Sequence, residues 1–270
     1  MADVEIYVCA SDKNLKDITR LKLPSNRKVI TTEKSGFKDN IDNLNPWYCE
    51  ASALYSLWKN STADIIGLEH YRRFFVSNGK ILNEEQIKSK LKENDIIACE
   101  MKLKSPTIDA GFRKGFVGFP WTKEKRCKIH WMLTDFLNHL SATEKYAEMS
   151  KFMQNELNHS SAFFKGNMFI AKRSVVEPWF EMMFTELESY LKSKNIKLDE
   201  SNLRSIGWLF EYLFLPWCHY MKLKIAPCNI REYDKCLKRI DTDIHAIVHK
   251  KIVIKAKKRT TSKIQDDWED

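Results

Sequence analysis

The sequence lacks any apolar run of about 18 residues, the length that a membrane-spanning helix requires. It also lacks the start of a secretory signal, because the opening residues MADVEIYVCASDKN carry acids where a basic end and an apolar core are needed. We therefore expect an intracellular, cytoplasmic protein. Its 270 residues are 43% apolar, which is enough to bury a sizeable core.

Paired cysteines are missing as well. The seven cysteines are scattered along the chain without a CxxC pair. An odd number in an intracellular protein argues against a disulfide framework, and the spacing argues against a zinc ribbon. We interpret the cysteines as reduced thiols, mostly buried, which behave as small hydrophobic side chains.

Common catalytic and nucleotide-binding motifs are also absent. The sequence has no GxGxxG fingerprint, no P-loop and no GxSxG elbow, and its histidines are not spaced as in an HExxH zinc site. No aspartate–any–aspartate triplet follows a predicted core strand, a place where a divalent ion is often held. The triplet Asp241–Asp243 lies in a polar region near the C-terminus, and we interpret it as coincidental.

What is present is an alternation of strand and helix patterns. Short β-branched or apolar runs predict strands, and apolar residues at helical spacing predict the helices between them. This order predicts an α/β fold in one domain, with a mixed, mainly parallel sheet flanked by helices. Residues 101–127 are basic and irregular, which predicts a loop that covers a functional site. The predicted strands are 4–9, 27–32, 63–68, 95–99 and 166–171, and the predicted helices begin at Asn45 or span 83–94, 127–139, 175–191 and 199–220.

A polar cluster follows one predicted core strand in the stretch IIGLEHYRRFF, residues 65–75. Ligands of open α/β sheets bind at the carboxyl ends of the strands. Arg72 and Arg73 can grip a diphosphate, His70 can donate to it or bind a metal, and Tyr71 can stack or donate. The alternative is that the arginines form surface salt bridges. The loop before Asn45, which is the predicted N-cap of its helix, should reach the same edge.

The net charge of +9 is concentrated near the C-terminus. The segment KKIVIKAKKRTTSK, residues 250–263, has seven basic residues and no acid. We expect a basic tail at 244–270 that follows a domain at 1–243. Such a tail is attracted to an anionic membrane surface, and the alternative is a solubilising terminus. A nucleic-acid-binding protein is a further alternative, but we expect no nucleic-acid partner, because the basic residues do not form one stripe with exposed aromatics.

Three blocks of the chain resemble a bacterial family of capsular and exopolysaccharide glycosyltransferases known as DUF4422. They are KDNIDNLNPWYCEASALYSLWKNSTADIIGLEHYRRFF, HSSAFFKGNMFIAKRSVVEPWFEMMFTELESYL and LDESNLRSIGWLFEYLFLPWCHY, and together they cover residues 38–220. The first block carries the family's rarest pattern, with the N-x-x-Y-C-E and H-Y-R-R segments. Weaker resemblance begins at EIYVCASDKN.

The resemblance implies a GT-A-like, Rossmann-like fold and a set of site residues. Departures from the family pattern occur at Ser11 and Asp12, where histidine and lysine are common, and at Tyr212, where arginine is common. The donor-binding residues implied are Ser11, Asp39, Asn40, Asn45, Tyr48, Glu50, His70, Tyr71, Arg72 and Arg73. The residues implied for the acceptor or sugar are His159, Asn167 and Arg204.

The activity implied is transfer of a sugar from a nucleotide-diphosphosugar, with UDP-hexose as the expected donor. The acceptor would be a hydroxyl of a glycan or a polyprenyl-linked carrier in surface polysaccharide synthesis, at the inner face of the membrane. A non-catalytic sugar-binding subunit of the same pathway is the alternative, since the departures at Ser11, Asp12 and Tyr212 leave catalysis open.

An inverting transferase needs a carboxylate to take the acceptor proton. Asp199 and Glu211 are the leading candidates and Glu50 is the third, although an aspartate at the position of Asp199 is also typical of a helix cap. Glu69 is a poor candidate because relatives commonly have a non-acidic residue there. We expect that a divalent metal such as Mn²⁺ or Mg²⁺ is dispensable or only stimulatory, and the alternative is that His70 or His159 is a metal ligand. Inversion and retention both stay open.

Overall fold

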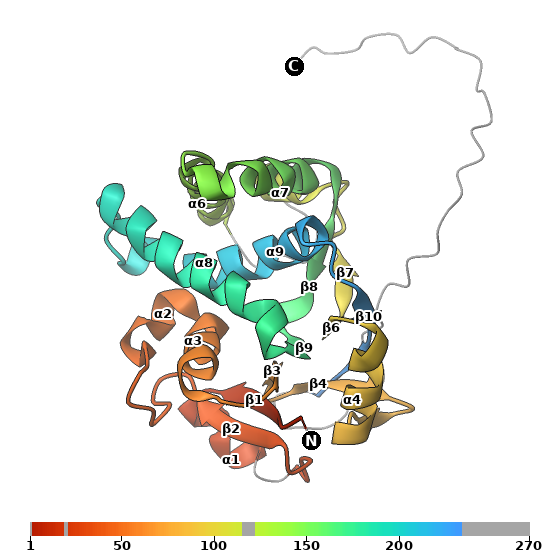
Figure 1. Ribbon diagram of the computed structural model, residues 1–270. Helices are drawn as coiled ribbons and strands as arrows, with labels where there is room; N and C mark the ends of the chain where they lie inside the picture. The colour runs from red at the N-terminus through yellow and green to blue at the C-terminus, as the bar shows by residue number, and fades with distance from the viewer. Residues whose placement is uncertain (1, 19–20, 115–121, 234–270) are drawn as a thin grey trace, which may run out of the picture.

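The computed structural model describes residues 2–18, 21–114 and 122–233 (Figure 1). The basic tail, the triplet Asp241–Asp243 and the expected domain boundary at residue 243 lie outside the described residues. Residues 115–121 of the predicted loop also lie outside the described residues.

The central sheet is mixed and mainly parallel, as predicted. Its strands lie in the order β10-β6-β9-β3-β1-β2, and β9 is antiparallel to both of its neighbours whereas the other pairs along β3-β1-β2 and β10-β6 are parallel. The central strands β1 and β3 are buried at nearly every position, as expected for strands that are covered on both faces. The strands are β1 (Val4–Ala10), β2 (Arg27–Thr31), β3 (Ile65–His70), β6 (Ile96–Ala98), β9 (Phe169–Lys172) and β10 (Ile225–Pro227).

Antiparallel strands extend the sheet beyond β3, and the sequence did not predict them. The chain reverses after His70, so that β4 (Arg73–Ser77) pairs back onto β3 at a single position, His70 opposite Arg73. β4 in turn pairs with β5 (Lys80–Ile81) and β11 (Asn229–Glu232). A separate two-stranded sheet joins β7 (Glu100–Lys102) to β8 (Ala162–Phe164).

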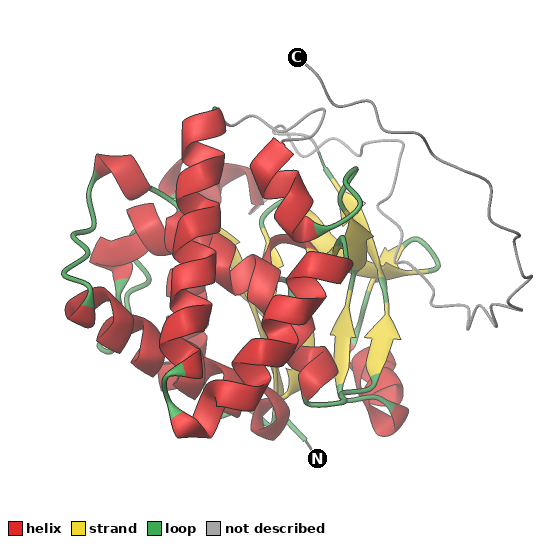
Figure 2. Ribbon diagram, turned by 90° about the horizontal axis from the view of Figure 1, so that it is seen from above, coloured by secondary structure: helices red, strands yellow, loops and turns green. Residues whose placement is uncertain are grey.

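Helices cover both faces of the sheet, and the thicker layer lies on one of them. The larger core joins inward residues of that face, such as Tyr7, Leu68 and Phe169, to the helices packed on it. Figure 2 shows these helices crossing in front of the strands. They are α3 (Glu50–Asn60), α6 (Lys123–Ser141), α7 (Ala147–His159), α8 (Arg173–Ser193) and α9 (Ser205–Tyr220), with α5 (Ile108–Lys114) beside α6.

The opposite face is covered more thinly. α4 (Glu84–Glu93) buries Ile87 and Leu91 against Ile6 and Ile170 of the sheet, and α1 (Leu15–Ile18) contributes Ile18 to a small third cluster. At the N-terminus of α4, Asn83 and Gln86 form a reciprocal capping box. Short 3₁₀ turns complete the fold at 12–14, 42–44, 144–146, 165–167 and 200–202.

The helix predicted to begin at Asn45 is the element that differs most from expectation. It is divided into α2 (Asn45–Tyr48) and α3 by Cys49, whose backbone has φ 50° and ψ −128°. Leu44, not the predicted Asn45, is the N-cap, and Pro46 lies in the first turn of the helix. The region 101–127 also differs, because it contains α5 and the first turn of α6 in addition to loop.

Candidate active site

A cavity of about 400 Å³ opens at the carboxyl ends of β1 and β3. It gathers six of the residues that the sequence proposed, from the first loop, α2, the start of α3, the end of β3 and the start of α9. Because these segments are far apart in the chain, only the sheet edge brings them together. The lining residues are Cys9, Ala10, Ser11, Asn14, Thr32, Asn45, Pro46, Cys49, Glu50, His70, Tyr71 and Arg204.

The break at Cys49 directs Glu50 toward this cavity. A positive φ at a non-glycine residue is strained, and here the neighbouring contacts hold it in place. Ser52 donates to the Cys49 carbonyl from its amide at 3.1 Å and from its hydroxyl at 2.8 Å. Gly207 of α9 lies so close that an added Cβ would be 2.9 Å from the Tyr48 carbonyl oxygen. The tertiary contact therefore fixes the break.

His70 forms the floor of the cavity and contacts the turn before β9. Its Nε2 lies 2.7 Å from the Gly166 carbonyl oxygen and 3.8 Å from Oε1 of Glu50. Burial lowers the pKa of His70, and the Arg73 charge lowers it further, while Glu50 opposes both. A Cβ at Gly166 would lie 3.0 Å from the imidazole ring, so the close approach requires glycine.

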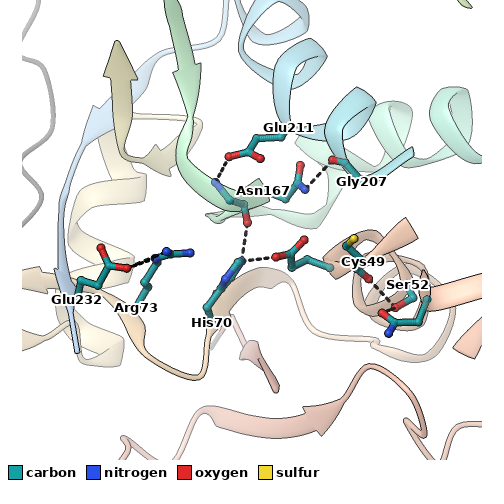
Figure 3. Close-up of polar contacts among 11 residues, drawn as sticks. Cys49, Ser52, His70, Arg73, Asn167, Gly207, Glu211 and Glu232 are labelled. Atoms are coloured by element: carbon teal, nitrogen blue, oxygen red, sulfur yellow. Dashed lines mark hydrogen bonds and ion pairs between the residues drawn. The ribbon is translucent and has the colours of Figure 1, made fainter. Parts of the chain in front are cut away.

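Glu211 lies behind Gly166 on α9 and is nearly fully buried. Its Oε1 accepts a hydrogen bond from the Gly166 amide at 2.7 Å (Figure 3). Burial raises the pKa of Glu211 to about 7, since the Gly166 hydrogen bond offsets only part of the desolvation and Glu50 adds to the rise. Glu211 and His70 thus contact the amide and the carbonyl group of the same residue, Gly166.

Arg72 and Arg73 turn to a different partner. Both guanidinium groups meet Oε1 of Glu232 on β11, Arg72 at 3.2 Å and Arg73 at 2.7 Å. Arg72 also donates to the Tyr233 carbonyl at 3.4 Å. Neither arginine lines the cavity, so the diphosphate grip expected from adjacent arginines is not assembled there.

Glu69 has a structural role. Its carboxylate is fully buried, pairs with Arg27 at 3.1 Å and accepts from the Phe75 amide at 2.9 Å. This arrangement agrees with the expectation that Glu69 is a poor base.

Three of the predicted donor residues lie away from the cavity. Asp39 accepts from the Tyr55 hydroxyl at 3.0 Å, and Asn40 forms bonds within its own loop. Tyr48 is buried and stacks on Phe184 beside a different, largely apolar cavity of about 650 Å³. These side chains shape the α2–α3 region, because their polar atoms or rings are engaged with it.

Three further candidates are also engaged in local structure. The exposed Asp199 caps a 3₁₀ turn by accepting from the Ser201 amide at 2.8 Å, and the hydrogen bonds from Ser201 lower its pKa. His159 is exposed at the end of α7 and contacts the Asn155 carbonyl at 2.8 Å. Asn167 is buried and donates to the Gly207 carbonyl at 3.2 Å. None of the three lines the cavity.

Sequence reasoning missed the two glycines that shape the floor. Gly166 and Gly207 stand in GNMF and SIGW, and the scarcity of glycine in this chain was the available signal. It also missed Glu232, which lies in an unpredicted strand. Across 2–18, 21–114 and 122–233, no three His, Cys, Asp or Glu side chains come together as a metal site would require.

The arrangement defines the class of fold. The fold of the chain is similar to that of the apo structure of WbbM, a bifunctional glycosyltransferase. The TM-score is 0.65 at 19% identity, and the alignment covers 89% of this chain. The chain spans 46% of the length of that structure.

The family follows from the sequence match. Residues 17–222 match the model of the family described as "Domain of unknown function (DUF4422)", and the chain belongs to this family. The resemblance found in the three blocks is confirmed. No curated protein matches the chain. In the described part of the chain, no helix has both the length and the apolar character to cross a membrane.

Proposed function

We propose that the protein is a glycosyltransferase that binds a nucleotide-diphosphosugar in the cavity at the carboxyl ends of β1 and β3. The observation that carries this proposal is the convergence there of an acid, Glu50, and a cation, Arg204, from opposite ends of the chain. The glycosyltransferase-like fold supports the same reading, because ligands of such sheets bind at this edge.

Arg204 is the cation best placed to contact a diphosphate. It is exposed, lines the cavity and adopts a left-handed backbone with φ 67°. Its amide donates to the Pro46 carbonyl at 2.9 Å, so the start of α9 is tied to α2. A guanidinium group matches phosphate oxygens in a bidentate geometry. Arg73 adds positive charge behind the floor, as its effect on the pKa of His70 indicates.

In this proposal the acceptor supplies a hydroxyl of a glycan or of a lipid-linked carrier, and UDP-hexose is the first donor to test. Ser11, Asn14 and Tyr71 offer neutral polar groups along the cavity wall to orient the donor. Preorganised cations stabilise the negative charge that develops on the departing diphosphate.

A panel of nucleotide-diphosphosugars tests the proposal. A donor at 100 times its dissociation constant should stabilise the fold by about 2.7 kcal/mol, which appears as a raised Tm. An oligonucleotide at equal phosphate concentration serves as the control and should have little effect. Release of nucleoside diphosphate is then measured with the donor that binds. Stabilisation by the oligonucleotide alone would contradict the proposal, and donor binding without release would favour the sugar-binding alternative.

A further inference from the structure

Three acids were candidates for the catalytic base, and their surroundings differ. Asp199 is committed to a cap and Glu211 accepts from the Gly166 amide. Glu50 lines the cavity with a quarter of its side chain exposed. Within the described ranges, its one ionic neighbour is His70 at 3.8 Å, and no described group donates a hydrogen bond to its carboxylate. Glu50 is thus the acid with a carboxylate available to a ligand.

We propose that Glu50 is the catalytic base that takes the proton from the acceptor hydroxyl, which makes the transfer an inverting one. This inference rests on the proposed function of the cavity, and it names a residue role and a stereochemical outcome that the proposed function leaves open.

The backbone around Glu50 fixes its direction. Glu50 is the first residue of α3 and follows the strained Cys49, so the chain turns immediately before the side chain leaves the helix. Hydrogen bonds from Ser52 and the packing of Gly207 hold this turn. Strained backbone persists where surrounding contacts over-determine it, and such residues cluster at active sites.

His70 acts as a positioning residue for Glu50. The Gly166 carbonyl can only accept a hydrogen bond, so Nε2 of His70 must carry a proton in the neutral ring. This hydrogen bond fixes the ring orientation and the tautomer, and the same Nε2 atom lies 3.8 Å from Oε1 of Glu50. Glu211 completes the support, because it holds the Gly166 amide from the other side.

The reaction step balances with these groups alone. The acceptor O–H bond breaks and its proton moves to a carboxylate oxygen of Glu50. The acceptor oxygen then forms a bond to the anomeric carbon, while the bond from that carbon to the diphosphate oxygen breaks and its electron pair leaves with the nucleoside diphosphate. Attack from the face opposite the diphosphate inverts the anomeric configuration.

The test compares Glu50→Gln with wild type, using the donor that binds in the panel and methanol as the acceptor hydroxyl. Methanol yields a methyl glycoside of stable configuration, which NMR assigns. Glu50→Gln should bind the donor within about threefold of wild type while its release of nucleoside diphosphate falls at least roughly a hundredfold, the lower range for losing general base catalysis. Wild type should give the inverted glycoside.

Glu148→Gln is the matched control, because Glu148 is an exposed helical acid that pairs only locally with Lys151. It should release product at the wild-type rate. Wild-type turnover in Glu50→Gln, a retained product configuration, or loss in Asp199→Asn with turnover kept in Glu50→Gln would each overturn the role of Glu50. Wild type that binds or consumes no donor in the panel would instead overturn the proposed function, so the two failures are distinguishable.

Discussion

The cavity at the end of β3 and the ion cluster on β4 and β11 contain neighbouring residues of one short sequence, yet they differ in how their charges are matched. His70 and Tyr71 line the cavity together with Glu50 and Arg204, and in the described part of the chain no ion pair joins Glu50 to Arg204. Two residues later, Arg72 and Arg73 share the carboxylate of Glu232. Charges that the protein satisfies internally hold the fold, whereas charges that face a cavity are available to a ligand.

The ion pair between Arg27 and Glu69 is the most deeply buried example of charges that are paired inside the protein. Both side chains are fully shielded from solvent. Replacing Glu69 by Leu should lower the free energy of unfolding by about 3–5 kcal/mol, because an uncompensated charge would remain on Arg27 in the core. Urea unfolding followed by circular dichroism measures this loss. The double variant Arg27→Met/Glu69→Leu should recover most of it, and a single-variant loss below about 1 kcal/mol would contradict a structural pair.

Glu211 is intermediate between the charged groups that are paired inside the protein and those that face the cavity. It is buried, but it supports the cavity floor through the Gly166 amide. Its folded pKa of about 7 is above its ordinary value of 4.5. Between these values the unfolded chain has released the proton and the folded protein still holds it, so stability falls as pH rises. The loss approaches roughly 3 kcal/mol for a shift of this size.

Glu211→Gln should remove this pH dependence, because the amide oxygen still accepts from the Gly166 amide and carries no charge. The measurement is the free energy of unfolding of both proteins at pH 4.5 and 7.5. The lowered pKa of His70 acts in the opposite direction, because its stability contribution is lost as pH falls through 6.5, but both proteins contain it. If the free energy of unfolding changed with pH in the same way in both proteins, the raised pKa of Glu211 would be refuted.

The smallest expected effect separates Arg204 from Arg72. Arg204→Asn keeps a residue that tolerates the left-handed backbone and should weaken donor binding by roughly ten- to a hundredfold, the value of a hydrogen bond to a charged group. Arg72→Ala should change the dissociation constant by less than about threefold, since Arg72 faces Glu232. Isothermal titration calorimetry of both variants measures the two dissociation constants. If Arg72→Ala weakened donor binding more than Arg204→Asn, the result would support the original prediction that Arg72 and Arg73 grip the diphosphate.

Much of the fold was predictable because its signals are local. The parallel strands, the helices 83–94 and 175–191 and the family blocks depend on periodicity and on rare residues in short windows. The antiparallel strands β4 and β11 were not predictable in the same way, because they are short and pair across more than 150 residues, as Arg73 and Glu232 do.

The sequence by itself determined the family, the mixed sheet and the set of polar residues near its carboxyl edge. Only the tertiary structure decided which of them share a cavity. The reversal after His70 turns Arg72 and Arg73 toward Glu232, and Gly207 of α9 packs on the strained Cys49 and so turns Glu50 inward. Side-chain direction at a turn depends on which distant segment packs against it, and no short window of sequence contains that segment.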